Sequence, residues 1–139
     1  MRENLFHGKR KDNGEWVEGC LLGSDVIVPK GQPFYICHDI LDSALKAYVV
    51  IPETVGQHIE RKDKNGKKIF EGDILHCTAR LDSANMVVIY ESAEFRLVLC
   101  ERYKTYTTGM GYKYFGCLDT EVIGNVYDNP ELIGGEANG

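Results

Sequence analysis

The sequence predicts a mainly β protein with little helix, and three observations carry this prediction. The 139 residues include 15 glycines and 8 tyrosines, a composition that favours short strands joined by tight turns. The dipeptide Asn-Gly occurs twice between strand-like segments, at Asn13-Gly14 and Asn65-Gly66, and is a strong hairpin signal. In the C-terminal half, apolar and polar residues alternate, as expected for strands with one buried face.

The N-terminal segment predicts a hairpin. Residues 5–10 lead into Asn13-Gly14, and residues 15–22 follow. We expect a type I′ turn, because its central positions need the positive φ angles that Asn and Gly tolerate. In the second strand, even-numbered residues from Trp16 lie on one face and odd-numbered residues from Val17 on the other. The pattern leaves open which face is buried.

The second Asn-Gly turn leads into a strand predicted over residues 69–75. Its surroundings repeat the Arg-Lys-Asp, Asn-Gly and Glu-Gly pattern of the first turn, which we attribute to shared turn chemistry rather than to duplication. The sequence Glu71-Gly72-Asp73-Ile74 is typical of a strand that bends as it enters a small SH3-like barrel, with Gly72 permitting a bulge.

Further strands are predicted along the rest of the chain, and Pro130 follows the last of them because proline cannot donate to a ladder. Residues 38–46 fit either one or two helical turns or an excursion between strands. The predicted strands are residues 26–28, 34–37, 47–51, 86–90, 95–100, 112–115 and 121–127.

These strands predict an SH3-like barrel or roll with an additional N-terminal β-hairpin layer. The hairpin region takes residues 1–60 and the barrel takes residues 61–133. The last residues, 134–139, are small and polar, and we expect a disordered tail there.

Composition excludes several function classes. No apolar run approaches the ~20 residues that span a bilayer, and the N-terminus lacks the apolar core of a secretory signal, so we expect a cytoplasmic protein without membrane contact. The formal net charge of −5 opposes nonspecific binding to nucleic acid. The five cysteines are widely spaced and form no C-x-x-C, so we expect free thiols.

The sequence predicts no catalytic residue, no metal and no cofactor. In His76-Cys77, adjacent side chains on a strand point to opposite faces and cannot grip one ion together. Glu71 and Asp73 are two positions apart in the sequence, so a continuous strand would place both side chains on one face. We favour a role in polar capping or in solvation of the hairpin over acid–base catalysis by this pair. A small metal-dependent hydrolase using His76, Cys77 or Asp73 stays as a remote alternative.

A run of aromatic residues with interleaved basic residues is the strongest candidate for an interaction surface. Aromatic side chains beside basic residues can stack on the nucleobases of single-stranded nucleic acid. Tyrosine is also frequent at protein interfaces. The favoured interpretation is a structural one, a hairpin whose tyrosines cover the barrel. If the surface does bind, a protein partner is favoured over nucleic acid because the chain is acidic. The residues of this surface are Tyr103, Tyr106, Tyr112, Lys113 and Tyr114.

Three segments together resemble the YopX family of phage and prophage proteins. They are residues 52–57 leading into residues 62–74, residues 122–132, and residues 8–17 at the front. The resemblance implies a β-rich, SH3-like fold and a phage setting inside a bacterial host cell, but it implies no reaction. The signature residues, expected to be structural, are Gly56, Asn65, Gly66, Glu71, Gly72, Asp73, Gly124, Asn125, Asn129 and Pro130.

The chain departs from the family pattern at residues 58–61. Where relatives usually carry Tyr-Thr-Gly-Leu, this chain has His-Ile-Glu-Arg, so Glu60 or its neighbour replaces a turn glycine. We therefore expect the local turn to differ in shape from that of the family. Residues 23–50 follow no motif of the family.

The resulting functional hypothesis is a non-enzymatic phage or prophage accessory protein that binds a protein partner or assembles with itself. The alternative is a single-stranded nucleic-acid-binding protein that uses the tyrosine run and the bases of residues 61–68.

Overall fold

The computed structural model describes residues 5–23, 26–29, 48–79, 82–91, 94–105 and 119–133. They form two antiparallel β sheets and three single-turn 3₁₀ helices, which confirms the mainly β class. Within these residues the sheets do not close into a barrel. The predicted strands at residues 34–37 and 112–115, residues 38–46 and the tail at 134–139 lie outside the described part.

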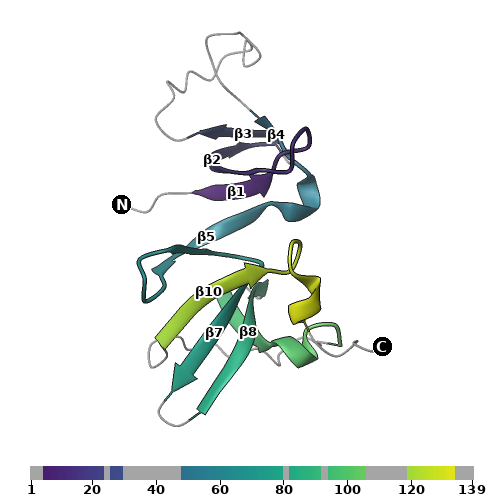
Figure 1. Ribbon diagram of the computed structural model, residues 1–139. Coiled ribbons are helices and arrows are strands. Elements are labelled where there is room, and N and C mark those ends of the chain that lie inside the picture. The colour runs from purple at the N-terminus through teal and green to yellow at the C-terminus, as the bar shows by residue number, and fades with distance from the viewer. Residues whose placement is uncertain are drawn as a thin grey trace. The chain divides into compact units, whose positions relative to one another are not determined.

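The chain divides into two compact units, Met1–His58 and Ile59–Gly139. In the first unit the strand order is β4-β3-β2-β1-β5, as Figure 1 shows. The strands are β1 (Phe6–Lys9), β2 (Trp16–Leu22), β3 (Val26–Pro29), β4 (Tyr48–Val49) and the beginning of β5 (Gly56–Lys62), with the 3₁₀ helix η1 (Pro52–Thr54) before β5.

The face of β2 that begins at Val17 is the buried one. Leu21 on this face pairs with Ile27 of β3, and Ile27 is fully buried. On the opposite face, Glu18 and Cys20 are exposed. The open question from the strand pattern is settled by this difference in burial.

The turn of the first hairpin is longer than the predicted type I′ turn. Arg10 N–H donates to the carbonyl of Glu15 at 2.8 Å, and Gly14 N–H donates to the carbonyl of Arg10 at 3.0 Å. Gly14 has φ +76°, but Asn13 does not have a positive φ. Asn13 Oδ1 instead accepts the N–H of Glu15 at 2.9 Å, so its side chain closes the turn. The type I′ prediction was wrong.

Glu60 in β5 has φ +69°, and it is the only described residue other than glycine with a positive φ. This is the place where the family pattern usually has glycine. A residue with a Cβ pays about 1–2 kcal/mol in the left-handed region. The backbone of Glu60 thus has a conformation that glycine would adopt without this cost.

Replacing Glu60 with glycine is expected to raise the free energy of unfolding by about 0.5–1 kcal/mol. The substitution removes the left-handed strain, and the greater freedom of glycine in the unfolded chain offsets part of that gain. Lys62→Gly in the same strand is the control, because its φ is not positive, and it should destabilise by about 0.5–1 kcal/mol. Urea unfolding compares the two variants; equal destabilisation by both would contradict the strain at Glu60.

In the second unit, β5 continues and pairs with β6, and a four-stranded sheet has the order β10-β7-β8-β9. The strand predicted over residues 69–75 is divided in two by a turn at Glu71-Gly72. The elements are β6 (Lys68–Phe70), β7 (Asp73–Ala79), β8 (Asp82–Glu91), β9 (Glu94–Leu99), the 3₁₀ helix η2 (Cys100–Arg102), β10 (Asp119–Asn125) and the 3₁₀ helix η3 (Pro130–Leu132).

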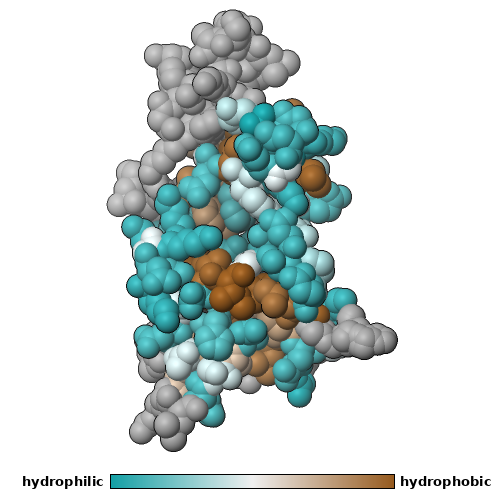
Figure 2. All heavy atoms as spheres, viewed as in Figure 1, coloured by the Kyte–Doolittle hydropathy of each residue, from teal (hydrophilic) through white to brown (hydrophobic). Residues whose placement is uncertain are grey.

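The surface of the second unit carries hydrophobic side chains at β10, and Figure 2 shows such a patch where β10 runs in Figure 1. The pairing of β10 with β7 shifts register between Val122 and Gly124. Ile123 is the extra residue of this bulge, and 37% of its surface is exposed. The bulge thus turns one large apolar side chain toward solvent.

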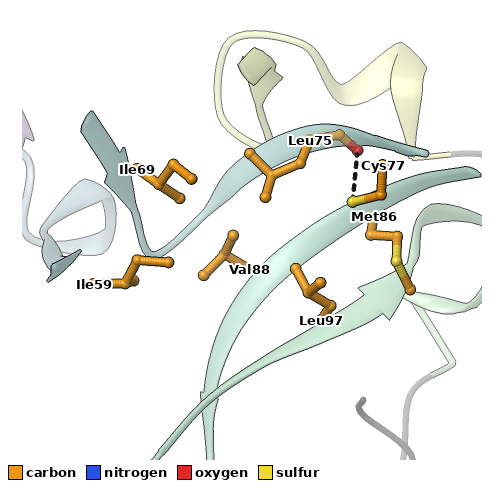
Figure 3. Close-up of a cluster of buried hydrophobic side chains, with 7 residues drawn as sticks. All are labelled: Ile59, Ile69, Leu75, Cys77, Met86, Val88 and Leu97. Atoms are coloured by element: carbon orange, nitrogen blue, oxygen red, sulfur yellow. Dashed lines mark hydrogen bonds between the residues drawn. The ribbon is translucent and has the colours of Figure 1, made fainter. Parts of the chain in front are cut away.

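The four-stranded sheet has a hydrophobic cluster on each face, because successive strand residues point to opposite sides. Leu75 and Val88 belong to one cluster, whereas their neighbours Ile74 and Val87 belong to the other. Complete burial of each such side chain contributes about 1.5–3 kcal/mol. Figure 3 shows the first cluster, which consists of Ile59, Ile69, Leu75, Cys77, Met86, Val88 and Leu97.

Candidate functional site: an acidic–aromatic cluster at the Glu71-Gly72 turn

The carboxylate of Asp63 organises the turn between β5 and β6. Its Oδ1 accepts the N–H groups of Asn65 and Lys67, both at 2.9 Å, and its Oδ2 accepts the N–H of Val122 at 2.9 Å. Burial acts to raise the pKa of Asp63, but these three bonds and the charge of Lys67 bring the pKa below its ordinary value. Asp63 is therefore held as a buried anion.

Asp63 and its neighbour also cover the outer edge of β10. Lys64 N–H donates to the carbonyl of Thr120 at 2.9 Å, next to the bond from Val122 to Asp63. An edge strand with unpaired backbone groups invites pairing with other chains. Here the β5–β6 turn forms hydrogen bonds with the carbonyl of Thr120 and the N–H of Val122, so these two edge groups of β10 are paired.

Asp63 was missed as a key residue, although a signal for it was present. Aspartate at the first position and glycine at the fourth mark a type I turn, and Asp63-Lys64-Asn65-Gly66 has this pattern. The structure has Gly66 at φ +85°, with its N–H donating to the carbonyl of Asp63 at 3.0 Å.

The Glu71-Gly72 turn is fixed from both sides by backbone bonds. Gly72 N–H donates to the carbonyl of Val88 at 2.9 Å, and its own carbonyl accepts the N–H of Val126 at 3.0 Å. Gly72 has φ +94°, which strongly favours glycine. Because a turn separates them, Glu71 and Asp73 do not share a strand face, and the sequence-based expectation that they would was wrong.

Asp73 is a buried carboxyl group at the start of β7. Its Oδ2 accepts the N–H of Phe70 at 2.8 Å. Burial raises the pKa of Asp73 to about 7, with a further rise from nearby Asp63, although the bond from Phe70 and the charge of Lys67 act against it. The bond from Phe70 is the polar capping that the sequence predicted, whereas the burial of Asp73 contradicts the alternative of a solvated side chain.

Asn125 and Asn129 bond backbone groups at the end of β10. Asn125 Oδ1 accepts the N–H groups of Tyr127 and Asp128 at 3.0 and 2.8 Å. Asn129 Oδ1 accepts the N–H of Asn125 at 3.1 Å. A Cβ at Gly124 would lie 2.5 Å from this same Oδ1, so a larger residue there would displace it. Pro130 then begins η3.

The charge of Glu71 acts on the hydroxyls of Tyr103 and Tyr127, and we call these three residues the acidic–aromatic cluster. The Tyr127 ring lies over Gly72, since a Cβ built there would be 3.1 Å from Cε2 of the ring. Tyr103 follows η2 and packs against the hydrophobic cluster that contains Ile74. Two aromatic rings and a carboxylate are thus brought together from three separate segments.

The electrostatics of the acidic–aromatic cluster are negative. Burial raises the pKa of Tyr103, and the charge of Glu71 raises it further. Burial, Tyr103 and Glu71 raise the pKa of Tyr127 to about 12. Both hydroxyls therefore stay protonated at neutral pH.

Of the interaction surface predicted from the tyrosine run, the structure describes Tyr103. The other members, Tyr106, Tyr112, Lys113 and Tyr114, lie outside the described residues. Sequence reasoning had no signal that would relate Tyr103 to Glu71 or to Tyr127, because the three residues lie in segments far apart along the chain. Tyr127, with 38% of its surface exposed, was not singled out.

The histidine and cysteine candidates are placed apart. His76 Nδ1 lies 2.8 Å from Asn85 Oδ1, whereas Cys77 is buried in the cluster of Figure 3. Burial raises the pKa of the Cys77 thiol to about 11, the opposite of what a nucleophilic thiolate needs. Within the described ranges, no group of three or more His, Cys, Asp or Glu residues is arranged to hold a metal ion.

None of the helices in the described part is long and apolar enough to cross a lipid bilayer.

Gly72→Ala is expected to destabilise the protein more than Gly66→Ala. Both glycines have positive φ, so both variants pay about 1–2 kcal/mol for a Cβ in the left-handed region. At Gly66 nothing lies within 4 Å of the added Cβ, whereas at Gly72 the Tyr127 ring lies 3.1 Å away. The difference between their urea unfolding free energies measures the Tyr127 contact, and equal values would show that Tyr127 yields freely.

A family model described as YopX protein matches residues 5–134. The crystal structure of protein EF1440 from Enterococcus faecalis is similar, with a TM-score of 0.51, 21% sequence identity and coverage of 96% of this chain and 100% of that chain. The X-ray structure of yopX from Bacillus subtilis gives a TM-score of 0.49, 19% identity and coverage of 97% and 98%. No curated protein sequence matches the chain.

Proposed function

Because the chain belongs to the YopX family, we propose that it is a non-enzymatic β module of a phage or prophage that binds a protein partner or assembles with itself. The observation that carries this proposal is the partly exposed Tyr127 ring, which lies over Gly72 of the Glu71-Gly72 turn. Tyrosines that are partly exposed on a fixed backbone are typical anchors of protein interfaces.

The hydrogen bonds of three signature residues and of Asp63 support a binding surface rather than a reaction. Asp63 and the signature residues Gly72, Asn125 and Asn129 take part in hydrogen bonds that fix backbone segments, as a preorganised interface requires. The raised pKa of the Cys77 thiol speaks against nucleophilic chemistry there. Within this proposal residues 61–133 form an SH3-like roll, residues 1–60 form a separate β-hairpin region, and the protein acts in the bacterial cytoplasm.

Binding of nucleic acid is the second candidate function, because exposed lysine residues cluster at the β5–β6 hairpin. Lys62, Lys64 and Lys67 are all exposed there. Against this candidate, Glu71 places a negative charge beside Tyr103, where a stacked strand would bring its phosphates. The net charge of −5 acts in the same direction.

The proposal is tested by sedimentation equilibrium of the pure protein and by affinity capture from bacterial host cells, followed by reconstitution with the purified captured protein. A stable oligomer, or a saturable complex with one purified partner, supports the proposal. A strict monomer that forms no reconstituted complex would overturn it. Saturable binding of single-stranded oligonucleotides, weakening steeply with salt, would favour the second candidate instead.

A further inference from the structure

We propose that the β5–β6 hairpin and the neighbouring bulge of β10 form a docking surface for an acidic segment of a partner protein that carries an apolar side chain. The residues of this surface, which we call the lysine–isoleucine surface, are Lys62, Lys64, Lys67 and Ile123. This assignment rests on the proposed function and narrows it, because it names the surface that binds and the chemistry of the occupant.

The two Asn-Gly turns share the pattern Arg-Lys-Asp, but their aspartates have different partners. In the first turn, the two carboxylate oxygens of Asp12 accept hydrogen bonds from Nε and Nη2 of Arg10 at 3.0 and 2.7 Å, so this carboxylate offsets the charge of a basic side chain. In the second turn, both carboxylate oxygens of Asp63 accept backbone N–H groups, and Asp63 is buried. The aspartate of the second turn is thus directed inward, whereas the lysines around it keep their charge at the surface.

The second turn concentrates positive charge on an acidic chain. Residues 61–68 contain five basic residues and one aspartate, a formal charge of +4, although the whole chain carries −5. Lys64 Nζ lies 3.8 Å from Glu121 Oε1, and both side chains are about half exposed. An exposed pair of this kind contributes little, so the carboxylates of a partner can compete with Glu121. A local positive surface of this kind attracts an acidic segment.

The backbone that presents the lysines is fixed by hydrogen bonds. Lys64 N–H donates to the carbonyl of Thr120 at 2.9 Å, and Gly66 N–H donates to the carbonyl of Asp63 at 3.0 Å. Lys67 N–H donates to Asp63 Oδ1 at 2.9 Å. Binding of a partner therefore has to order the lysine side chains but not the turn that carries them.

Ile123 adds an apolar contact beside the lysines. The preceding residue, Val122, donates its N–H to Asp63 Oδ2 at 2.9 Å, so the bulge of β10 lies next to the β5–β6 turn. Of the surface of Ile123, 37% is exposed, and Figure 2 shows the hydrophobic patch at β10 with hydrophilic residues around it. An apolar centre with a polar rim is typical of protein interfaces.

The aliphatic side chain of Ile123 favours a protein partner over nucleic acid. Single-stranded nucleic acid binds through its phosphates and through stacking of its nucleobases on aromatic rings, and isoleucine has no ring. A long polyanion also extends past the few lysines onto a chain that is otherwise acidic. A short acidic protein segment fits both parts of the surface, because its carboxylates can pair with the lysines while one apolar side chain packs on Ile123.

The probe is the peptide acetyl-Glu-Asp-Leu-Asp-Glu-amide, titrated into the full chain while the Ile123 methyl signals and the hairpin amides are followed by NMR. Two matched peptides each remove one feature: acetyl-Gln-Asn-Leu-Asn-Gln-amide has no charge, and acetyl-Glu-Asp-Ser-Asp-Glu-amide has no large apolar side chain. We expect saturable shifts with the first peptide, with a Kd on the order of 1 mM, and about fivefold weaker binding of each matched peptide. Binding of either matched peptide with the affinity of the first would overturn the proposal.

Four variants separate the surface from general effects of charge and hydrophobicity. Lys67→Gln removes one charge from the surface, whereas Lys11→Gln removes one from the exposed part of the first Asn-Gly turn. Ile123→Ser removes the apolar contact, whereas Val49→Ser changes an exposed apolar residue of the first unit. We expect about two- to fivefold weaker peptide binding by each surface variant and unchanged binding by each control. Wild-type affinity in either surface variant would overturn the proposal.

A single-stranded thymidine oligonucleotide is titrated under the same conditions. We expect it to bind more weakly than the acidic peptide at physiological salt, because the chain is net acidic. Tighter binding of the oligonucleotide than of the peptide, weakened in Lys67→Gln and unchanged in Ile123→Ser, would assign the surface to nucleic acid and overturn the proposal.

In the reconstituted complex, the same variants distinguish failure of this site from failure of the proposed function. Weaker partner binding by Lys67→Gln than by Lys11→Gln supports both proposals. A complex that both variants form with wild-type affinity would overturn the lysine–isoleucine surface and leave the proposed function standing. Peptide binding by a protein that is monomeric and forms no complex would overturn the proposed function and, with it, the presentation of an acidic segment by a partner.

Discussion

Asp63→Ala is expected to lower the free energy of unfolding by about 3–5 kcal/mol, because hydrogen bonds to a charged group contribute about 1.5–3 kcal/mol each and unsatisfied buried donors add a cost. The carboxylate accepts three backbone N–H groups, from Asn65, Lys67 and Val122. An effect above 4 kcal/mol is exceptional for one substitution. Urea unfolding followed by circular dichroism measures it.

Two further variants test the cause. Asp63→Asn keeps one acceptor oxygen and should lose less stability than Asp63→Ala. Asp82→Ala removes an aspartate that is exposed on β8, and should change stability by no more than about 0.5 kcal/mol. If Asp63→Ala falls within the range of Asp82→Ala, the three bonds do not hold the turn as described.

The pH dependence of Asp63 has a definite sign. Its folded pKa lies below the unfolded value, so its contribution is present above the unfolded pKa of about 3.9. The contribution is lost as the pH falls from that value through the folded pKa. In acid, wild type and Asp63→Asn should therefore converge in stability.

The wild-type protein is expected to lose stability as the pH rises toward 7, because Asp73 then ionises in a buried place. The Asp73→Asn variant is expected not to show this loss. The folded pKa of Asp73 is raised to about 7, so the folded state binds the proton more tightly. The contribution is full below the unfolded pKa and is lost as the pH rises through about 7. A difference of about three pKa units corresponds to about 4 kcal/mol.

The asparagine amide keeps an oxygen for the N–H of Phe70 and does not ionise. Unfolding free energies of wild type and Asp73→Asn should therefore be similar near pH 4 and diverge in favour of the variant at pH 8. The comparison cancels other groups that titrate in both proteins. Parallel stability profiles over this range would show that the Asp73 carboxylate is better solvated than its burial indicates.

Local patterns were enough to predict the hairpins, because two strands joined by a short connection need only nearby residues. Residues 86–90 and 95–100 were predicted as neighbouring strands, and β8 and β9 pair antiparallel there. The break at Glu71-Gly72 was harder to predict, because the run of apolar residues around it is that of one continuous strand. The bonds from Gly72 to Val88 and Val126 decide the turn, and both come from distant segments.

The candidate site could be predicted only in pieces. Tyr103 and Glu71 were each considered, one as part of an interaction surface and the other as a signature residue. Their proximity, and the arrival of Tyr127 over Gly72, depend on tertiary packing that leaves no periodic trace in the sequence. By contrast, Glu60 was identified from the sequence as the replacement of a turn glycine, and its positive φ is a conformation that favours glycine.

The hydrogen bonds of Asp63 also have a consequence for the order of folding. Two of its acceptor bonds reach residues two and four positions away, so they can form as soon as the β5–β6 hairpin closes, on the order of microseconds. The third reaches Val122, 59 positions along the chain, and must wait for a long loop to close. The closed hairpin therefore holds the Asp63 carboxylate in place as an acceptor for the last strand. Docking of β10 then adds the third hydrogen bond to a carboxylate that already accepts two.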